Sequence, residues 1–283
     1  MRRITASNGV VYYRSEMIPC MNGFSTRIGG VSQLTHTASL NLGMERGDPK
    51  ETVFENLSRF GKALGFDAQD VISVSQIHST SIRFVTLDHK GEGFFRPQGQ
   101  SCDGYVTNQQ GIVLGVRTAD CVPILLYAPS NKTGFSGAVA AVHAGWRGTA
   151  GKIVCKAVDY LCELGADLNT ICAAIGPAIG RCCYEVRKDF YDAFQSSVGS
   201  ELTEKYVLPH SNKDNIWMAD LQGVNEELLL RYGIKKDRID LCQICTCCHP
   251  EEFYSHRHSH GMRGTMLSVI SLSPSFHPFH LWE

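Results

Sequence analysis

The sequence lacks long hydrophobic runs and lacks the pattern of an export signal. Its longest apolar stretch, from Val122 to Ala128, is far shorter than the roughly 18 residues that cross a bilayer. The first residues are basic, but polar residues follow where the apolar part of a secretory signal peptide would lie. We therefore expect no membrane partner and a cytoplasmic location, where thiols stay reduced.

An excess of charge of either sign is also missing. The chain has 27 Lys and Arg against 28 Asp and Glu, which gives a formal net charge of −1. This balance argues against a nucleic-acid partner, because such proteins carry a basic surface. The phosphate-binding loop of nucleoside triphosphate enzymes and the glycine fingerprint of dinucleotide enzymes are absent too, which argues against both classes.

No internal repeat, low-complexity tract or linker divides the chain, so we predict one domain over residues 1–283. Several predicted strands follow each other without a helix between them. This order favours an α/β fold of the α+β sandwich type, with mixed sheets and flanking helices. Strands are predicted over 10–13, 71–74, 81–87, 112–117, 122–127, 138–143, 171–175, 239–244 and 266–272. Helices are predicted over about 49–64, 149–164 (with Thr149 as N-cap), 187–196 and 221–232, and a polar excursion over 197–215.

What the chain does have is 12 cysteines and 11 histidines. A cytoplasmic protein of this size needs no disulfides, so its cysteines are core residues, metal ligands or nucleophiles. His78, Cys121 and His143 each lie at or just beyond the end of a predicted strand. If those strands are neighbours, two imidazoles and one thiolate meet and suit zinc, with a fourth position open as in catalytic sites. The intervals are too wide for a motif, and spacing alone favours ordinary core residues.

A second group of cysteines lies between Cys242 and Cys248, followed by His249. A structural zinc site would need a further ligand pair, which His256, His258 and His260 could supply. We favour reduced cysteines near a pocket over this separate zinc site.

Other residues could bind anions or move protons. Arg27 and Arg147 lie in glycine-rich turns, where a guanidinium and exposed backbone N–H groups could bind phosphate or carboxylate. A structural turn with a surface arginine is the alternative. Four acids next to predicted strand or helix ends could be general acids or bases, or could simply cap turns. They are Asp103, Asp120, Glu185 and Asp220.

Several strings, taken together, are similar to those of a known family. In order they are FSTRIGGVS from Phe24, SLNLG from Ser39, QIH from Gln76, TADCVP from Thr118, HAGWRG from His143, IGP from Ile175, CYEV from Cys183, CT from Cys245 and FYS from Phe253. Over about residues 20–272 the chain resembles the YfiH family, also called the laccase-domain or multicopper polyphenol oxidoreductase family.

The resemblance implies that His78, Cys121 and His143 are metal ligands, for zinc or alternatively copper. It implies a purine nucleoside phosphorylase that acts on adenosine, inosine and methylthioadenosine, with adenosine deaminase activity. The expected partners are purine nucleosides and phosphate. Older names imply a copper-dependent polyphenol oxidase, and a further proposed role is editing of peptidoglycan precursors. Multicopper chemistry needs many imidazoles at several sites, whereas the matched residues offer one metal position.

Within this family interpretation we assign Arg27 and Arg147 to phosphate, Ser39 and Asn41 to ribose or base, and a proton-handling role to Asp103 or Asp120. Two further hypotheses stay open: a metal-free hydrolase with Cys121 as nucleophile and His143 or His78 as base, and a non-enzymatic binding module. The chain departs from the family near its end, where Thr265 replaces the usual arginine and Arg263 is the neighbouring substitute. The sequence does not predict an oligomeric state.

Overall fold

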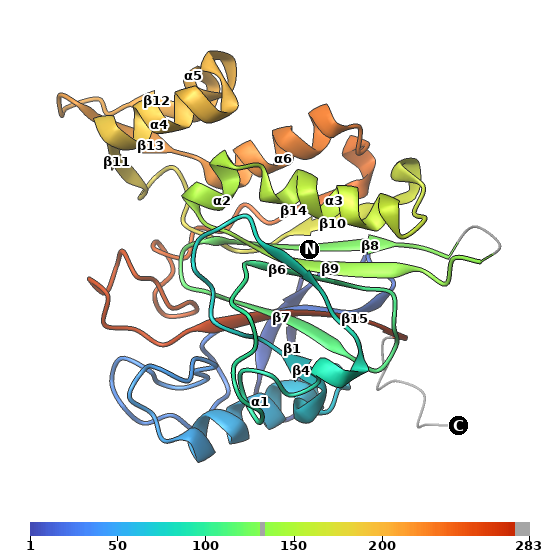
Figure 1. Ribbon diagram of the computed structural model, residues 1–283. Coiled ribbons are helices and arrows are strands. Elements are labelled where there is room, and N and C mark those ends of the chain that lie inside the picture. Colours follow the sequence, from blue (N-terminus) through green and yellow to red (C-terminus); the bar gives the residue numbers. More distant parts are fainter. Residues whose placement is uncertain (131–133, 275–283) are drawn as a thin grey trace.

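Two six-stranded sheets pack face to face at the centre of the molecule. Figure 1 shows them in the computed structural model, which describes residues 1–130 and 134–274. The first sheet has the order β1 (Arg2–Thr5), β2 (Val11–Arg14), β3 (Cys20–Ser25), β15 (Met266–Pro274), β7 (Val113–Thr118), β4 (Val71–Ile72). The second has the order β14 (Ile239–Leu241), β10 (Cys172–Ile175), β8 (Val122–Ala128), β9 (Ala138–Ala144), β6 (Gly104–Thr107), β5 (Ile82–Phe84). Both contain parallel and antiparallel pairs.

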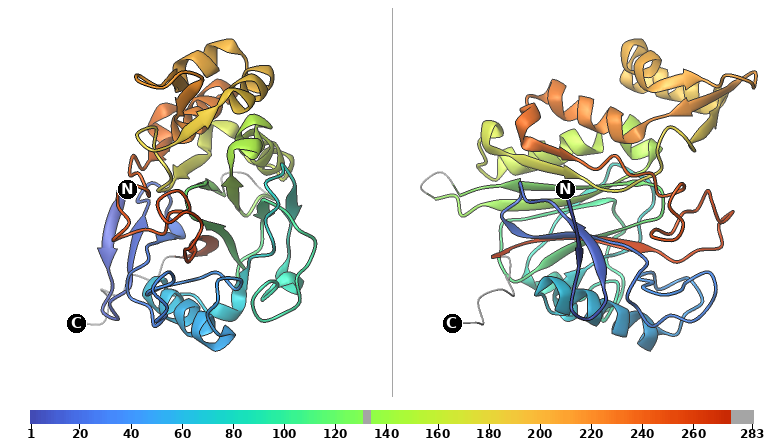
Figure 2. Two further views of the ribbon diagram at one scale, coloured as in Figure 1. Left: turned by 90° about the vertical axis from the view of Figure 1, so that its left-hand side faces the viewer. Right: turned by 180° about the vertical axis from the view of Figure 1, so that it is seen from behind.

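A small third sheet and six α-helices complete the described part of the chain. The third sheet has the order β11 (Glu185–Arg187), β13 (Ile216–Ala219), β12 (Val207–Pro209). The helices are α1 (Lys50–Leu64), α2 (Trp146–Ala150), α3 (Ile153–Glu163), α4 (Lys188–Val198), α5 (Ser200–Tyr206) and α6 (Leu221–Tyr232). Short 3₁₀ helices occupy Ala68–Asp70, Leu87–His89, Leu168–Thr170 and Lys236–Arg238. The third sheet lies with α4 and α5 at the opposite end of the molecule from α1 (Figures 1 and 2).

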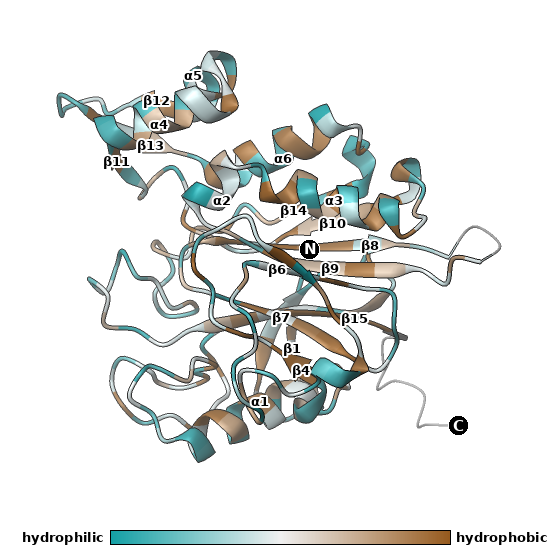
Figure 3. Ribbon diagram, viewed as in Figure 1, coloured by the Kyte–Doolittle hydropathy of each residue, from teal (hydrophilic) through white to brown (hydrophobic). Residues whose placement is uncertain are grey.

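The sheets and helices form layers around three buried clusters. Side chains of both sheets, such as Phe24 and Leu125, fill the space between the sheets. Leu57 and Phe60 of α1 cover the outer face of the first sheet, while α3 and α6 cover that of the second. Strands β8 and β9 are therefore buried on both faces, which explains their nearly continuous apolar sequences (Figure 3).

The predicted fold class is confirmed, but some predicted elements are wrong. Thr149 is not an N-cap, because the helix that contains it, α2, begins earlier at Trp146. The helical conformation is interrupted at Lys152, which has φ +56°, and a second helix, α3, follows. The polar stretch 197–215 contains α5 and β12. Strand β3 was not predicted because it contains Asn22, whose buried amide donates to carbonyls of Ser15, Ile18 and Cys20. One domain over the whole chain stays a prediction.

Within residues 1–130 and 134–274, no helix has both the length and the apolar character that crossing a membrane requires.

Candidate active site

The pairing of β8 with β9 brings two of the predicted metal ligands together. Cys121 directly precedes β8, and His143 lies near the end of β9. The strands are antiparallel, and Pro123 of β8 pairs with His143. Cys121 and His143 therefore lie at the same end of the second sheet. His78 reaches this end from the connection between β4 of the first sheet and β5 of the second, where it adopts a positive φ of 57°.

The three side chains form a compact cluster, which we call the His–Cys–His cluster. Their candidate ligand atoms all lie within 4.8 Å of one another, and Cys121 Sγ is 3.9 Å from His78 Nε2. His143 is buried, Cys121 is half-buried and His78 is exposed, so the cluster opens to solvent on the His78 side. A Cβ atom on Gly145 would lie 2.8 Å from the His78 ring, so a larger residue at this position would push His78 out of its place in the cluster.

Asp103 holds the ring of His143 and the backbone of His78. It precedes β6, whose pairing with β9 puts it next to His143. His143 donates its backbone N–H to the Asp103 carbonyl at 2.7 Å, and its ring Nδ1 lies 2.8 Å from Asp103 Oδ1. The backbone N–H of His78 donates to the same carboxylate at 3.0 Å, and Ser79 donates to its other oxygen. Nε2 of His143 thus stays available for a metal, as in carboxylate–histidine–metal arrangements.

Two members of this group are more acidic than usual. Burial opposes ionisation of Asp103, but hydrogen bonds from His143 and Ser79 outweigh it and lower the pKa of this carboxyl to about 2. Burial also opposes ionisation of Cys121, yet the neighbouring His143 and His78 lower the pKa of its thiol below the usual value. The thiolate is the form of cysteine that binds metals.

The cluster fits a zinc ion. Bonds of about 2.0–2.3 Å from zinc to nitrogen and sulfur place neighbouring tetrahedral ligands about 3.6 Å apart. The distance of 3.9 Å between Cys121 and His78 is close to this value. Two histidines and a cysteine also suit copper. In the described residues, however, the other group able to hold a metal consists of cysteines alone and offers no imidazole-rich copper site.

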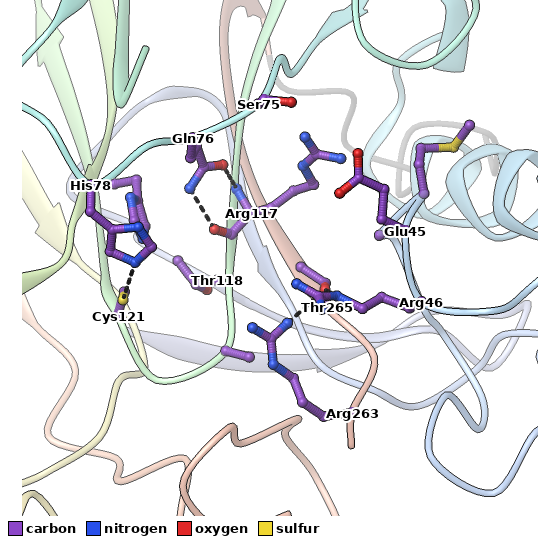
Figure 4. A pocket seen from close by; sticks show the side chains of 14 residues that line it. Glu45, Arg46, Ser75, Gln76, His78, Arg117, Thr118, Cys121, Arg263 and Thr265 are labelled. Atoms are coloured by element: carbon purple, nitrogen blue, oxygen red, sulfur yellow. Dashed lines mark hydrogen bonds between the residues drawn. The ribbon is translucent and has the colours of Figure 1, made fainter. Parts of the chain in front are cut away.

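A cavity of about 180 Å³ opens beside the cluster, and we call it the arginine pocket (Figure 4). Arg46, Arg117 and Arg263 line it together with the three residues of the cluster. Arg263 donates to Thr265 Oγ1 at 3.0 Å, while its buried Nε has no hydrogen-bond partner within the described parts of the chain. Burial and the nearby Arg46 lower the pKa of Arg263 to about 10. Crowded arginines with a spare donor are suited to a phosphate-sized anion.

A second cavity of about 330 Å³ lies next to the same cluster, and we call it the aromatic pocket. It shares His78 and Cys121 with the arginine pocket, so the cluster lies between the two. Asp120 also lines it and accepts hydrogen bonds from Thr246 and from the backbone of Arg257. The other lining residues are Ile77, Trp146, Arg147, Ile179, Tyr184 and Leu221.

Three predicted substrate-binding residues lie outside these two cavities. Arg27 donates to the carbonyls of Ala38 and Pro250 and lines a third cavity, which contains none of the His–Cys–His residues. Ser39 Oγ accepts from backbone N–H groups of the Arg27 loop, and the buried Asn41 bonds to Thr265 N and to neighbouring loop atoms. These side chains hold the loop together, and their roles in binding substrate stay predictions.

Of the residues predicted to bind substrate or move a proton, Arg147 and Asp120 line the aromatic pocket. Arg147 is exposed, and its guanidinium lies 4.3 Å from the centre of the Trp146 ring. Asp103 is fully buried beside His143 and lines neither cavity, so its place suits the positioning of His143.

The other predicted acids and histidines have structural contacts or join no metal-capable group within the described part of the chain. Glu185 accepts a hydrogen bond from Lys213, and Asp220 caps α6. The later histidines His256, His258 and His260 join neither metal-capable group of the described residues.

Sequence reasoning missed the arginine pocket almost entirely. Arg46 and Arg117 carried no recognisable signal, because one lies in a loop and the other near the end of β7. The only signal was the unusual Thr265. The Thr265 hydroxyl accepts hydrogen bonds from Arg263 and, at 3.4 Å, from Arg46. The neighbouring Arg263 therefore reaches the pocket although position 265 itself has no arginine.

Comparison with known proteins shows the family of the chain. A profile of the family described as "Multi-copper polyphenol oxidoreductase laccase" matches residues 21–273. The chain belongs to this family. The resemblance found in the sequence is thereby confirmed.

Relatives in this family carry enzyme names. "Purine nucleoside phosphorylase YlmD" from Geobacillus stearothermophilus is 34% identical over 252 residues, which cover 88% of each chain. "Adenosine deaminase RL5" from an unknown prokaryotic organism is 34% identical over 243 residues, covering 84% of this chain and 88% of its own. The crystal structure of YlmD from Geobacillus stearothermophilus has a TM-score of 0.84 at 31% identity, covering 96% of this chain and 98% of its own.

Replacing Asp103 with asparagine should weaken metal binding by the His–Cys–His cluster about 10- to 100-fold. The amide cannot accept from Ser79 and His143 as the carboxylate does, so His143 loses its fixed orientation. Chelator competition on the folded protein measures the affinity. Asp192→Asn, in an exposed pair with Lys188, is the matched control. Equal metal affinity of Asp103→Asn and the control would remove the positioning role.

Proposed function

We propose that the protein is a zinc-dependent purine nucleoside phosphorylase acting on adenosine, inosine and methylthioadenosine, with adenosine deaminase activity. The observation that carries this proposal is the position of the His–Cys–His cluster between an arginine pocket and an aromatic pocket. A nucleoside phosphorylase must hold a flat base and an anion on opposite sides of a ribose. The names of the relatives support the same activity.

The aromatic pocket is suited to the purine. Trp146 and Tyr184 offer flat rings for packing against the base, and Ile179 and Leu221 provide apolar surface. Of the two acids predicted to handle a proton, Asp120 lines this pocket and Asp103 does not. We therefore assign the contact with the leaving base to Asp120.

The arginine pocket is suited to the phosphate. Arg46 and Arg263 both line this pocket and share the Thr265 hydroxyl. Two guanidinium groups can bind phosphate through charge-assisted hydrogen bonds and hold it against the ribose. Phosphorolysis breaks the bond between C1′ and the base and forms a bond from C1′ to a phosphate oxygen, and the base leaves with a proton. The arginines stabilise the phosphate charge during this exchange.

His78, Cys121 and His143 would hold the zinc ion, with Asp103 orienting the His143 ring and bonded to the backbone of His78. When bound, zinc supplies Lewis acidity, which polarises oxygen atoms and makes water a stronger acid. Deamination at C6 of adenosine consumes water and releases ammonia, so it needs no phosphate. The two activities should therefore differ in their need for the arginine pocket.

Product analysis of the purified protein tests this proposal. With adenosine and phosphate, we expect adenine and ribose 1-phosphate, with the ribose 1-phosphate equal to the sum of adenine and the hypoxanthine that forms from inosine. Without phosphate, adenine should disappear while inosine still forms. Formation of neither adenine nor inosine would contradict the proposal, and oxygen consumption with a phenol by a copper-containing protein would favour the polyphenol oxidase instead.

A further inference from the structure

Four cysteines outside the active site converge from two segments far apart in the sequence. Cys182 and Cys183 lie between β10 and β11, and Cys245 and Cys248 lie in the segment after β14. Their Sγ atoms are all within 4.8 Å of one another. We call this group the four-cysteine cluster. None of its members lines the arginine pocket or the aromatic pocket.

The spacing of the sulfur atoms matches that of a tetrahedral metal site. Cys248 Sγ lies 3.4 Å from Cys182 Sγ and 3.4 Å from Cys183 Sγ. Around a zinc ion with bonds of about 2.3 Å, the sulfurs of a tetrahedron lie about 3.8 Å apart. This value falls between the shortest contacts and the 4.8 Å limit of the cluster. Small side-chain movements would therefore be enough to surround zinc.

Main-chain contacts hold the two segments together beside the cluster. Ala178 and Cys245 form a parallel β-bridge, and Thr246 N–H donates to the Ala178 carbonyl at 3.0 Å. Gly180 N–H donates to Cys245 Sγ at 3.1 Å, and hydrogen bonds to sulfur favour the thiolate that zinc binds. A Cβ atom at Gly180 would lie 3.2 Å from that of Cys245, so glycine permits the close approach. The sulfur atoms are thus held together by the fold itself.

A disulfide explains this arrangement less well than a metal. Cys182 and Cys183 are equally close to Cys248, yet a disulfide could join only one of them to it. A second disulfide would then have to join Cys245, which is buried, to the remaining cysteine. A metal uses all four sulfurs, and four thiolates fill a tetrahedral coordination shell without leaving a position for substrate. The cluster is therefore suited to a structural metal.

We propose that the four-cysteine cluster binds a structural zinc ion that fixes one wall of the aromatic pocket. Tyr184, which lines that pocket, directly follows Cys183. Thr246 directly follows Cys245 and donates to Asp120 of the same pocket at 2.7 Å. Zinc at the cluster joins the two segments that carry these residues.

The zinc content of the reduced protein, purified without chelators, tests the proposal. We expect about two zinc ions per chain, about one in the C182S/C248S variant, and about two in the matched C155S/C162S control on α3. Cys121→Ala, which lacks a ligand of the other site, should keep about one zinc ion and lose it when C182S and C248S are added. A zinc-free Cys121→Ala protein, or zinc content unchanged by C182S/C248S, would overturn the proposal.

A second measurement uses the unmutated chain, in case the C182S/C248S variant does not fold. Iodoacetamide labelling with peptide mapping should show the exposed Cys182 and Cys248 protected in zinc-loaded protein and labelled after chelation under reducing conditions. Equal labelling in both states would overturn the proposal. A disulfide from Cys248 to either Cys182 or Cys183 in the protein as purified would overturn it as well.

Discussion

Cys121→Ala should lower kcat/KM for adenosine phosphorolysis by about 10³-fold or more, since Lewis-acid stabilisation contributes several kcal/mol. The substitution removes the thiolate from the His–Cys–His cluster and leaves two imidazoles, which hold zinc poorly. Cys121 is half-buried, and its side chain is small, so the fold should persist. Steady-state kinetics together with metal analysis measure both effects. Cys155→Ala, at a half-buried cysteine of α3, should change neither.

The same variant cannot by itself separate the metal enzyme from a cysteine hydrolase, because both lose Cys121. The metal enzyme predicts that activity disappears together with the zinc of the His–Cys–His cluster, while the four-cysteine cluster keeps its own zinc ion. Full phosphorolysis by Cys121→Ala protein that has lost zinc from this cluster would contradict the proposed site.

Arg263→Met should raise the KM for phosphate about 10- to 100-fold, because a charge-assisted hydrogen bond contributes about 1.5–3 kcal/mol. Arg263 lines the arginine pocket and has a buried Nε donor with no partner in the described residues, whereas methionine fills similar space without charge. Adenosine deamination needs no phosphate and should change little. The rate of phosphorolysis at a series of phosphate concentrations gives the KM for phosphate. The rate of adenosine deamination by the same preparation gives the comparison.

Arg27→Met provides the contrast, because sequence reasoning assigned phosphate to Arg27. Its guanidinium is bonded to the carbonyls of Ala38 and Pro250, so the loss should lower stability and leave the KM for phosphate nearly unchanged. If Arg27→Met raises the phosphate KM while Arg263→Met does not, phosphate binds elsewhere and the arginine pocket has another role.

The core of the site could be predicted from the sequence because it depends on strand ends. Apolar runs located β8 and β9, and their antiparallel pairing brings Cys121 and His143 to one end of the sheet. His78 was singled out because it follows the strand predicted over 71–74, and the family strings then favoured all three residues as metal ligands. Asp103 was singled out as an acid, but its role depends on the pairing of β6, a four-residue strand that the sequence pattern did not reveal.

The arginine pocket could not be predicted, because its residues meet only through long-range contacts. Arg46 and Arg263 approach each other through the hydroxyl of Thr265, more than 200 positions from Arg46. Asn41 holds the same two segments together through Thr265 N. Loops that pack by side-chain hydrogen bonds carry no periodicity from which their partners could be inferred.

The four-cysteine cluster was missed for a related reason. The sequence showed a cysteine-rich segment from Cys242 to Cys248, and partners were sought among the histidines that follow it. The structure places Cys182 and Cys183 there instead, from a turn more than 60 positions upstream. The β-bridge between Ala178 and Cys245 sets this pairing, and it joins residues outside any strand.

The most direct measurement is adenosine phosphorolysis by the protein after chelation and again after zinc is restored. Chelation should abolish release of adenine and ribose 1-phosphate, and zinc should restore it in proportion to the metal bound by His78, Cys121 and His143. Phosphate-dependent release of adenine at an undiminished rate by protein without zinc would show that the His–Cys–His cluster acts without a metal or takes no part in the reaction.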